Sequence, residues 1–314
     1  MSEKQRLLTG LQSSGDLHIG NYFGALKPFL EMYEDYDSVL MVADYHALTS
    51  VRSPDVLRAN IHNVVRDYLA VGVDPDKVIM FRQSDNQDHM ELGWVFNCLV
   101  TVPFLMQAHA YKAKVDQGIE ANAGLFTYPM LQAADIALYN TDIVPVGEDQ
   151  RQHLEYSREA VGKFNRAYGE LLKAPQEKII AGVGVVPGTD GQKMSKSYGN
   201  TIPLFGSTEA IEKAVMSIVT DSDGDRPEHV YAIHRLLKSE TELAELYEAS
   251  KGRYGDLKKA LVTDLEAFIE PMRDRRAQIT DADVQRVLTE GATKAKVISN
   301  ETINKVRQAV GIRL

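Results

Sequence analysis

The 314-residue chain has only one cysteine and one tryptophan, and it lacks long hydrophobic runs. A disulfide needs two cysteines, so Cys98 excludes an intramolecular disulfide and favours an intracellular protein. No stretch approaches the roughly 20 apolar residues of a transmembrane helix. Residues 1–6 lack the apolar region of a signal peptide. We therefore expect a cytoplasmic protein with no membrane partner.

Excess positive charge is also absent. The formal net charge is −9, which argues against a DNA-binding protein and against nucleic-acid binding by electrostatics alone. The charge is uneven, however, because residues 251–314 contain 13 Lys and Arg against 9 Asp and Glu, a net +4. Two interpretations stay open for this segment. It contacts the phosphates of an RNA, or it is an ordinary solvated helical surface, which charge alone favours.

Short apolar runs alternate with helical patterns in the first half of the chain. Four runs predict buried strands, at residues 6–12, 38–43, 77–81 and 142–146. Helices are expected at 21–36 and, with Ser53 as N-cap and Pro54 in the first turn, from 53 to 72. The alternation predicts an α/β fold, a Rossmann-like doubly wound parallel sheet with ligands at the carboxyl ends of the strands.

The remaining segments are expected to be helical. Residues 85–140 form a helical insertion, in which Trp94 and Cys98 are expected to pack. Beyond residue 205 the strand signals stop, and helices are expected at 207–220, 227–238, 240–250, 255–278, 281–290 and 292–310. This divides the chain into an α/β domain at 1–204, an all-helical domain at 205–290, and a final helical segment at 291–314.

Two short motifs indicate phosphate chemistry. His18, Gly20 and Asn21 lie at a helix start, where backbone N–H groups favour an anion. Residues 193–197 read Lys-Met-Ser-Lys-Ser, and two lysines on a small polar loop suit the negative charge of transferring phosphates. Each motif has a structural alternative, local packing of His18 and a solvated turn. Their occurrence together favours a phosphate site.

The order of His-Ile-Gly-Asn at 18–21 and Lys-Met-Ser-Lys-Ser at 193–197 resembles the class I aminoacyl-tRNA synthetases. Segments 9–12, 43–49, 133–135 and 140–150 resemble the tryptophanyl-tRNA synthetases in particular, and the resemblance covers nearly the whole chain. It implies ATP as a substrate with Mg²⁺ bound through its phosphates, and L-tryptophan and tRNA(Trp) as partners. It also implies that residues 1–204 form the nucleotide-binding catalytic domain and that the protein is a homodimer whose helical domain at 205–290 binds the anticodon. The last segment, 291–314, is expected to pack back on the catalytic domain.

By this resemblance, Asp135 is the residue expected to select the amino acid. Tyr128, Gln132 and Asp135 share one face of a helix that is expected to begin at Pro129. Asp135 lies among alanines and aliphatic residues, where an unpaired carboxylate would be costly. Because an indole N–H only donates, a buried carboxylate aimed at it would discriminate against phenylalanine. The alternative is a structural hydrogen bond.

The resemblance implies roles for three sets of residues. Those expected to act in catalysis are His18, Asn21, Lys114, Lys193, Ser195 and Lys196. Those expected to bind ATP are Gln12, Ser13, Ser14, Gly20, Asn21, Gly147, Glu148, Asp149, Val186, Lys193, Met194, Ser195, Lys196 and Ser197. Those expected to bind tryptophan are Leu8, Thr9, His46, Tyr128, Gln132, Asp135 and Gln150. No protein ligand to a metal is expected.

The chain departs from the family pattern at two pocket positions. Leu8 stands where an aromatic residue commonly packs on the substrate ring, and Gln132 stands where methionine is common. Two other functions stay open. A tyrosyl-tRNA synthetase would share fold and mechanism, but the similarity at 140–150 opposes it. A paralogue that binds RNA or a protein without charging tRNA is opposed by the intact His18, Lys193 and Lys196.

Overall fold

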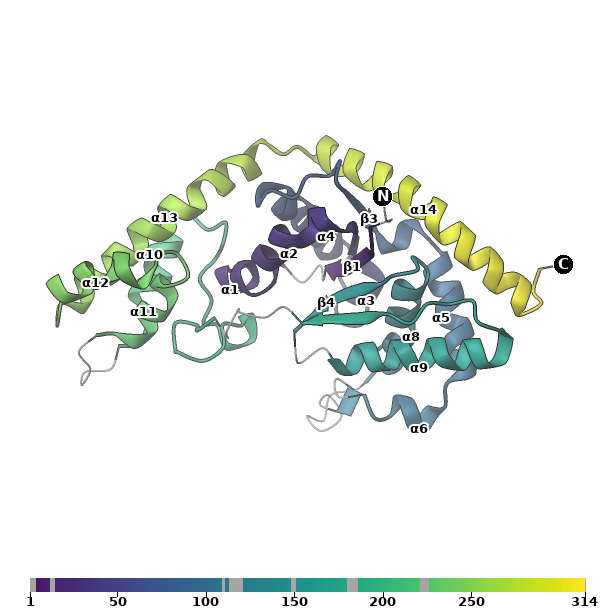
Figure 1. Ribbon diagram of the computed structural model, residues 1–314. Coiled ribbons are helices and arrows are strands. Elements are labelled where there is room, and N and C mark those ends of the chain that lie inside the picture. The colour runs from purple at the N-terminus through teal and green to yellow at the C-terminus, as the bar shows by residue number, and fades with distance from the viewer. Residues whose placement is uncertain are drawn as a thin grey trace.

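The structure, a computed structural model, describes residues 4–11, 15–108, 111–112, 121–147, 151–179, 186–220 and 226–313. A parallel sheet in the order β3-β2-β1-β4-β5 forms its centre (Figure 1). The strands are β1 Arg6–Leu11, β2 Asp37–Val42, β3 Val78–Arg82, β4 Ile143–Val146 and β5 Gln176–Ile179. The predicted α/β fold and its first four strands are confirmed. The short edge strand β5 was not predicted.

Both faces of the sheet are buried. Leu7 and Leu40 join one hydrophobic cluster, whereas their chain neighbours Leu8 and Met41 join the other. Successive side chains of a strand point to opposite faces, so the two clusters lie on opposite sides of the sheet. This two-sided burial explains why the strands read as continuous apolar runs rather than as alternating patterns.

Helices connect the strands and build the insertion. Before β4 they are α1 Ile19–Asn21, a π-helical turn at Tyr22–Leu26, α2 Lys27–Met32, a 3-10 turn at Tyr33–Asp35, α3 Asp44–Ala47, α4 Pro54–Ala70, α5 Asp88–Leu99, α6 Val102–Leu105 and α8 Ala123–Ala137. Helix α9, Arg151–Tyr168, follows β4 and was not predicted. The first helix starts at Ile19 rather than at Asn21. Ser53 caps α4 as expected, accepting from the Val56 N–H at 3.4 Å.

Helix α8 begins earlier than predicted. Its N-cap is Asn122, whose Oδ1 accepts from the Leu125 N–H at 2.9 Å. Pro129, expected to be the first residue, lies inside the helix. A proline carries no N–H, and it therefore removes the hydrogen bond to the carbonyl of Leu125 one turn before. The helix continues through this gap, and residues 128, 132 and 135 keep their common face.

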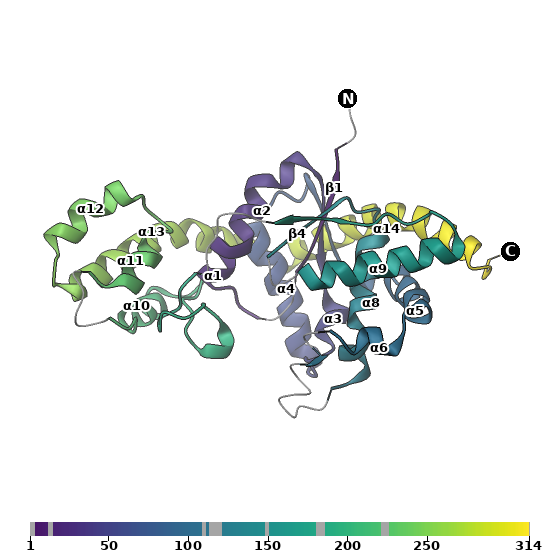
Figure 2. The same ribbon diagram turned by 60° about the horizontal axis from the view of Figure 1, so that its bottom comes forward.

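The C-terminal third of the described chain is helical. It consists of α10 Thr208–Met216, α11 Glu228–His234, α12 Glu240–Ala249, α13 Tyr254–Gln278 and α14 Asp281–Ala309. Helices α10 to α12 gather at one end of the molecule, α13 leads from them toward the sheet, and α14 runs along β3 (Figures 1 and 2). Phe268 of α13 stacks on Phe23 at 5.4 Å between ring centroids. The helical part thus packs directly on the segment that follows His18. The domain boundaries at 204 and 290 stay predictions.

The predicted break between helices at residue 291 is wrong, because α14 is continuous through Gly291. A Cβ added to Gly291 would lie 1.7 Å from the carbonyl oxygen of Met80 in β3. Glycine is therefore required here for a close approach of helix to strand, and it does not end the helix.

We expect Gly291→Ala to lower the free energy of unfolding by about 1–3 kcal/mol or more, because the added methyl group meets backbone that cannot rotate away. Urea denaturation measures the change. Gly255→Ala is the matched control, since nothing lies within 4 Å of its added Cβ in α13. Alanine should stabilise that helix slightly. Equal stability of the two variants would show that α14 does not lie this close to β3.

Candidate active site

Two cavities open at the carboxyl ends of β1 and β4, where the strand order of the sheet reverses. The first has a volume of about 460 Å³ and the second about 570 Å³. Gly10, Asn21 and Ala25 line both of them, and the two therefore form one continuous site. Ligands of open α/β sheets bind at this switch point.

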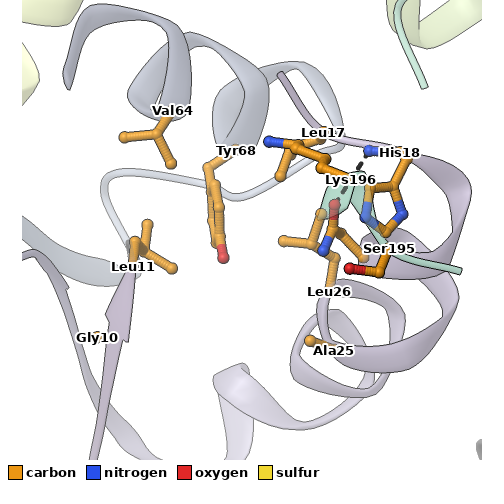
Figure 3. Close-up of a pocket in the computed structure, with 11 residues that line it drawn as sticks. Gly10, Leu11, Leu17, His18, Ala25, Leu26, Val64, Tyr68, Ser195 and Lys196 are labelled. Carbon is orange, nitrogen blue, oxygen red and sulfur yellow. Dashed lines mark hydrogen bonds between the residues drawn. The ribbon is translucent and has the colours of Figure 1, made fainter. Parts of the chain in front are cut away.

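The two phosphate motifs meet in the first cavity. Backbone hydrogen bonds join the segment after the lysine loop to the segment before α1, from the Ile19 N–H to the Ile202 oxygen at 3.0 Å and from the Leu204 N–H to the Leu17 oxygen at 2.9 Å. This pairing places Ser195 and Lys196 beside the His18 ring (Figure 3). The structure thus unites two halves of a site that are far apart in sequence.

His18 presents a neutral imidazole to this cavity. Burial, with a smaller contribution from Lys196, lowers the pKa of His18 to about 4. Its buried Nδ1 has no hydrogen-bond partner among the residues that the structure describes. A Cβ on Gly20 would lie 2.9 Å from this Nδ1, so the glycine makes room for the ring. Asn21 fixes the turn, its Oδ1 accepting from the His18 N–H at 3.1 Å. In the tautomer that carries its proton on Nδ1, this nitrogen can donate to a phosphate oxygen at the helix start.

The lysine loop reaches the cavity with only part of its motif. Ser195 and Lys196 line the cavity. Met194 and Val186 are buried in the hydrophobic core, where the Met194 N–H donates to the Val186 oxygen at 2.9 Å. The side chain of Lys193 is exposed and lines neither cavity. Ser197 is also exposed, with its Oγ 2.8 Å from that of Ser195.

Asn200 holds this loop in shape and was not predicted from the sequence. It is 2 % exposed. Its Oδ1 accepts from the Ser195 N–H at 2.8 Å, and its Nδ2 donates to the Lys193 oxygen at 3.1 Å and to Asp190 Oδ1 at 2.7 Å. The available sequence signal was its position directly after Gly199. In the structure this glycine has a φ of 64° and ends the loop.

The second cavity contains the residues expected to bind the amino acid. Those that line it are Leu8, Thr9, His46, Tyr128, Gln132 and Asp135. Gly147, which was expected to bind ATP, lines this cavity as well. Leu8 and Thr9 lie within β1, Gly147 directly follows β4, and three of the others come from one face of α8. His153, which was not predicted, joins this wall and lies 2.7 Å from the Tyr128 hydroxyl.

Asp135 is buried and receives three side-chain donors. Gln83 Nε2 donates to Oδ1 at 2.7 Å, His89 Nδ1 contacts the same oxygen at 2.7 Å, and His46 Nε2 contacts Oδ2 at 2.8 Å. Burial acts to raise the pKa of Asp135, but the hydrogen bonds from the two histidines overcome it and lower the pKa to about 2. Gln83 and His89 were not predicted individually, although Gln83 lies among the polar residues that follow β3.

Several predicted residues lie outside the described part of the chain, namely Gln12, Ser13, Ser14, Lys114, Glu148, Asp149 and Gln150. Among the described residues, no group of three or more His, Cys, Asp or Glu could hold a metal ion. In the same part of the chain, no helix is both long and apolar enough to span a bilayer.

Comparison with known proteins gives a consistent result. The family model for class I tRNA synthetases (W and Y) matches residues 1–272. The tryptophan–tRNA ligase of Fusobacterium nucleatum is 43 % identical over 98 % of both chains. That of Rhodopirellula baltica is 42 % identical over 98 % of this chain and all of the relative.

A solved structure agrees along the whole length. The tryptophanyl-tRNA synthetase of Campylobacter jejuni, complexed with ADP and tryptophan, has a TM-score of 0.92 and 38 % identity, covering 98 % of this chain and 100 % of that one. With relatives this similar over nearly their full length, the chain belongs to the tryptophanyl-tRNA synthetases of the class I aminoacyl-tRNA synthetase family.

Proposed function

We propose that the two joined cavities form the site where L-tryptophan is activated by ATP. The enzyme is a tryptophan-specific class I ligase that uses ATP, tryptophan and tRNA(Trp). The observation that supports the site assignment is the wall shared by the cavity of Asp135 and the cavity of His18 and Lys196. At this wall the carboxylate of a bound amino acid can meet the α-phosphate of ATP.

In the first step a tryptophan carboxylate oxygen attacks the α-phosphorus, and the bond to the leaving pyrophosphate breaks. The products are tryptophanyl-adenylate and pyrophosphate. In the second step a ribose hydroxyl of the tRNA attacks the acyl carbon and releases AMP. Neither step needs a covalent enzyme intermediate, because positioning and charge stabilisation suffice. We assign the phosphate contacts to His18, Asn21, Ser195 and Lys196, which line the first cavity.

Mg²⁺ fits this site as a companion of the phosphates. The described residues that line the first cavity include no carboxylate, whereas phosphate oxygens are ligands that Mg²⁺ prefers. When bound, the ion would neutralise charge that develops on the pyrophosphate. The residues of the chain hold and orient the phosphate groups around it.

Asp135 supplies the contact that selects tryptophan. Its Oδ1 already accepts from two side chains, and its Oδ2 has one partner, His46, among the described residues. A carboxylate oxygen can accept a second hydrogen bond, so Oδ2 can bind the indole N–H. Phenylalanine offers no N–H to this oxygen.

The homodimer and the tRNA contact are proposals of the same kind. Trp94, expected to pack inside the insertion, is 70 % exposed, and Cys98 is also exposed. Trp94, Met90 and Leu48 line one surface cavity of about 260 Å³, an apolar patch of the kind that subunits cover. Sedimentation equilibrium would contradict a dimer through this patch if it gave the mass of one chain.

We assign the anticodon contact to α10–α13. Because tRNA is charged for translation, we assign the enzyme to the cytoplasm.

Pyrophosphate–ATP exchange tests the activity directly. We expect exchange that depends on an amino acid, with kcat/KM for tryptophan exceeding that for phenylalanine by about a hundredfold or more, because phenylalanine brings no donor to Asp135. Tryptophan should also be preferred over tyrosine. Absence of exchange with every amino acid would overturn the enzymatic assignment. A preference for tyrosine would leave the reaction standing but would contradict the substrate.

A further inference from the structure

Behind the amino-acid cavity, Asp135 is connected to a buried residue that does not itself line either cavity. His89 of α5 is fully buried, beside Phe81 and Tyr139. Its Nδ1 lies 2.7 Å from Asp135 Oδ1, and its Nε2 lies 2.8 Å from the Tyr139 hydroxyl. His46, the other histidine on Asp135, lines the cavity itself. Any influence of His89 on a substrate must therefore pass through Asp135.

A series of hydrogen bonds runs from Asn86 through Tyr139 and His89 to Asp135. The bonds of the Tyr139 hydroxyl determine which group donates at each step. Asn86 Nδ2 donates to the Tyr139 hydroxyl oxygen at 3.1 Å. The hydroxyl proton is then available to His89 Nε2, which accepts it, and the remaining ring proton lies on Nδ1 and is donated to Asp135. One arrangement of protons satisfies every group, which is the condition under which a buried polar network fixes a conformation.

Asn86, at the far end of this series of hydrogen bonds, is held by the C-terminal helix α14. Lys296 and Ser299 of α14 contact Asn86, with Lys296 Nζ donating to Oδ1 at 3.0 Å and Ser299 Oγ accepting from Nδ2 at 2.9 Å. Both also bond to Asp88 Oδ2, at 2.7 and 2.9 Å respectively. The Asp88 N–H at the start of α5 also donates to Asn86 Oδ1 at 3.3 Å. Asn86 therefore cannot turn without breaking contacts on two elements, α14 and α5.

We propose that His89 is a positioning residue that sets tryptophan selection by holding the Asp135 carboxylate in one orientation. The inference rests on the proposed function of the site. With Oδ1 held from behind by His89 and Gln83, the carboxylate cannot rotate, and Oδ2 stays directed at the His46 side, where the indole N–H is to bind. Tyr139 and Asn86 hold His89 in turn.

The test compares KM for tryptophan with KM for ATP in two variants. In His89→Leu the donor to Asp135 is lost, and in Tyr139→Phe only the hydroxyl that orients His89 is lost. We expect each to raise KM for tryptophan by about tenfold or more and to lower the tryptophan-over-phenylalanine ratio of kcat/KM by a similar factor. KM for ATP should stay unchanged, because neither residue lines the phosphate cavity.

Two further variants separate positioning from general destabilisation. His89→Asn places an amide N–H near the former Nδ1 and should restore most of the selectivity. Tyr33→Phe removes the hydroxyl of another buried tyrosine, 3 % exposed and outside both cavities, and should leave selectivity unchanged. If His89→Leu does not fold, Tyr139→Phe carries the test.

The outcomes distinguish this inference from the proposed function. If the unmodified enzyme shows no tryptophan preference, the proposed function fails. If the enzyme prefers tryptophan and folded Tyr139→Phe keeps both its preference and its KM, His89 is not a positioning residue. Equal changes in KM for tryptophan and for ATP would likewise overturn the inference, since they indicate a general loss of structure.

Discussion

Lys196→Ala is expected to slow tryptophan-dependent pyrophosphate exchange by about 10²–10³-fold, the usual loss when one group that stabilises transition-state charge is removed. Lys196 lines the phosphate cavity beside His18. A Cβ on Gly15 would lie 3.5 Å from its Nζ, so the amine reaches across to the loop before α1. Because the leaving pyrophosphate gains charge during the reaction, the loss should appear mainly in kcat.

The matched control for this loss is Lys213→Ala, which removes an exposed lysine of α10 that lines neither cavity. It should leave exchange unchanged. Thermal denaturation of both variants should match the unmodified enzyme, because neither lysine contributes to the core. An unchanged exchange rate in Lys196→Ala would remove this residue from the mechanism.

The sequence predicted the sheet well where strands are buried on both faces. The apolar runs that became β1 to β4 are readable because helices cover both sides of the sheet. Strand β5, Gln176–Ile179, carries charged residues at the sheet edge, and its pattern is too short and too polar to read. At Gly291 the sequence predicted a feature that is absent, a break in the helix. The effect of this glycine on α14 depends on the carbonyl of Met80, a contact that no local pattern contains.

The candidate site was predictable to the extent that its chemistry lies in short motifs. His18, Lys196 and Asp135 are found in such motifs, and the structure places each in a cavity wall. The side chains that orient them come from distant segments. Asn200 and His89 act through buried hydrogen bonds, and only the folded chain brings them to the loop and to Asp135.

Asp135→Asn is expected to lower kcat/KM for tryptophan by about a hundredfold. The amide oxygen can take the place of Oδ1, held by the donors Gln83 and His89. The amide nitrogen then stands in place of Oδ2, where it meets the indole N–H donor to donor. The variant keeps the size of the side chain, so circular dichroism should show an unchanged fold.

A tryptophan analogue with sulfur in place of the ring N–H makes this prediction specific. In the unmodified enzyme the analogue removes the indole donor and leaves Oδ2 with His46 alone among the described residues, and its kcat/KM should fall by about a hundredfold relative to tryptophan. In Asp135→Asn the same exchange of substrate should cost little, because the contact is already lost. If the two losses simply multiply, Asp135 and the ring nitrogen act independently, and the carboxylate does not read the indole N–H.

The ionisation of Asp135 gives this preference a definite pH range. Its pKa is lowered to about 2 from the usual 3.8, so the contribution of the carboxylate to stability is fully present above the higher value and is lost as pH falls through the lower one. The ratio of kcat/KM between tryptophan and its sulfur analogue should therefore stay constant from about pH 6 to 9. A ratio that titrates within that range would assign the contact to a group other than Asp135.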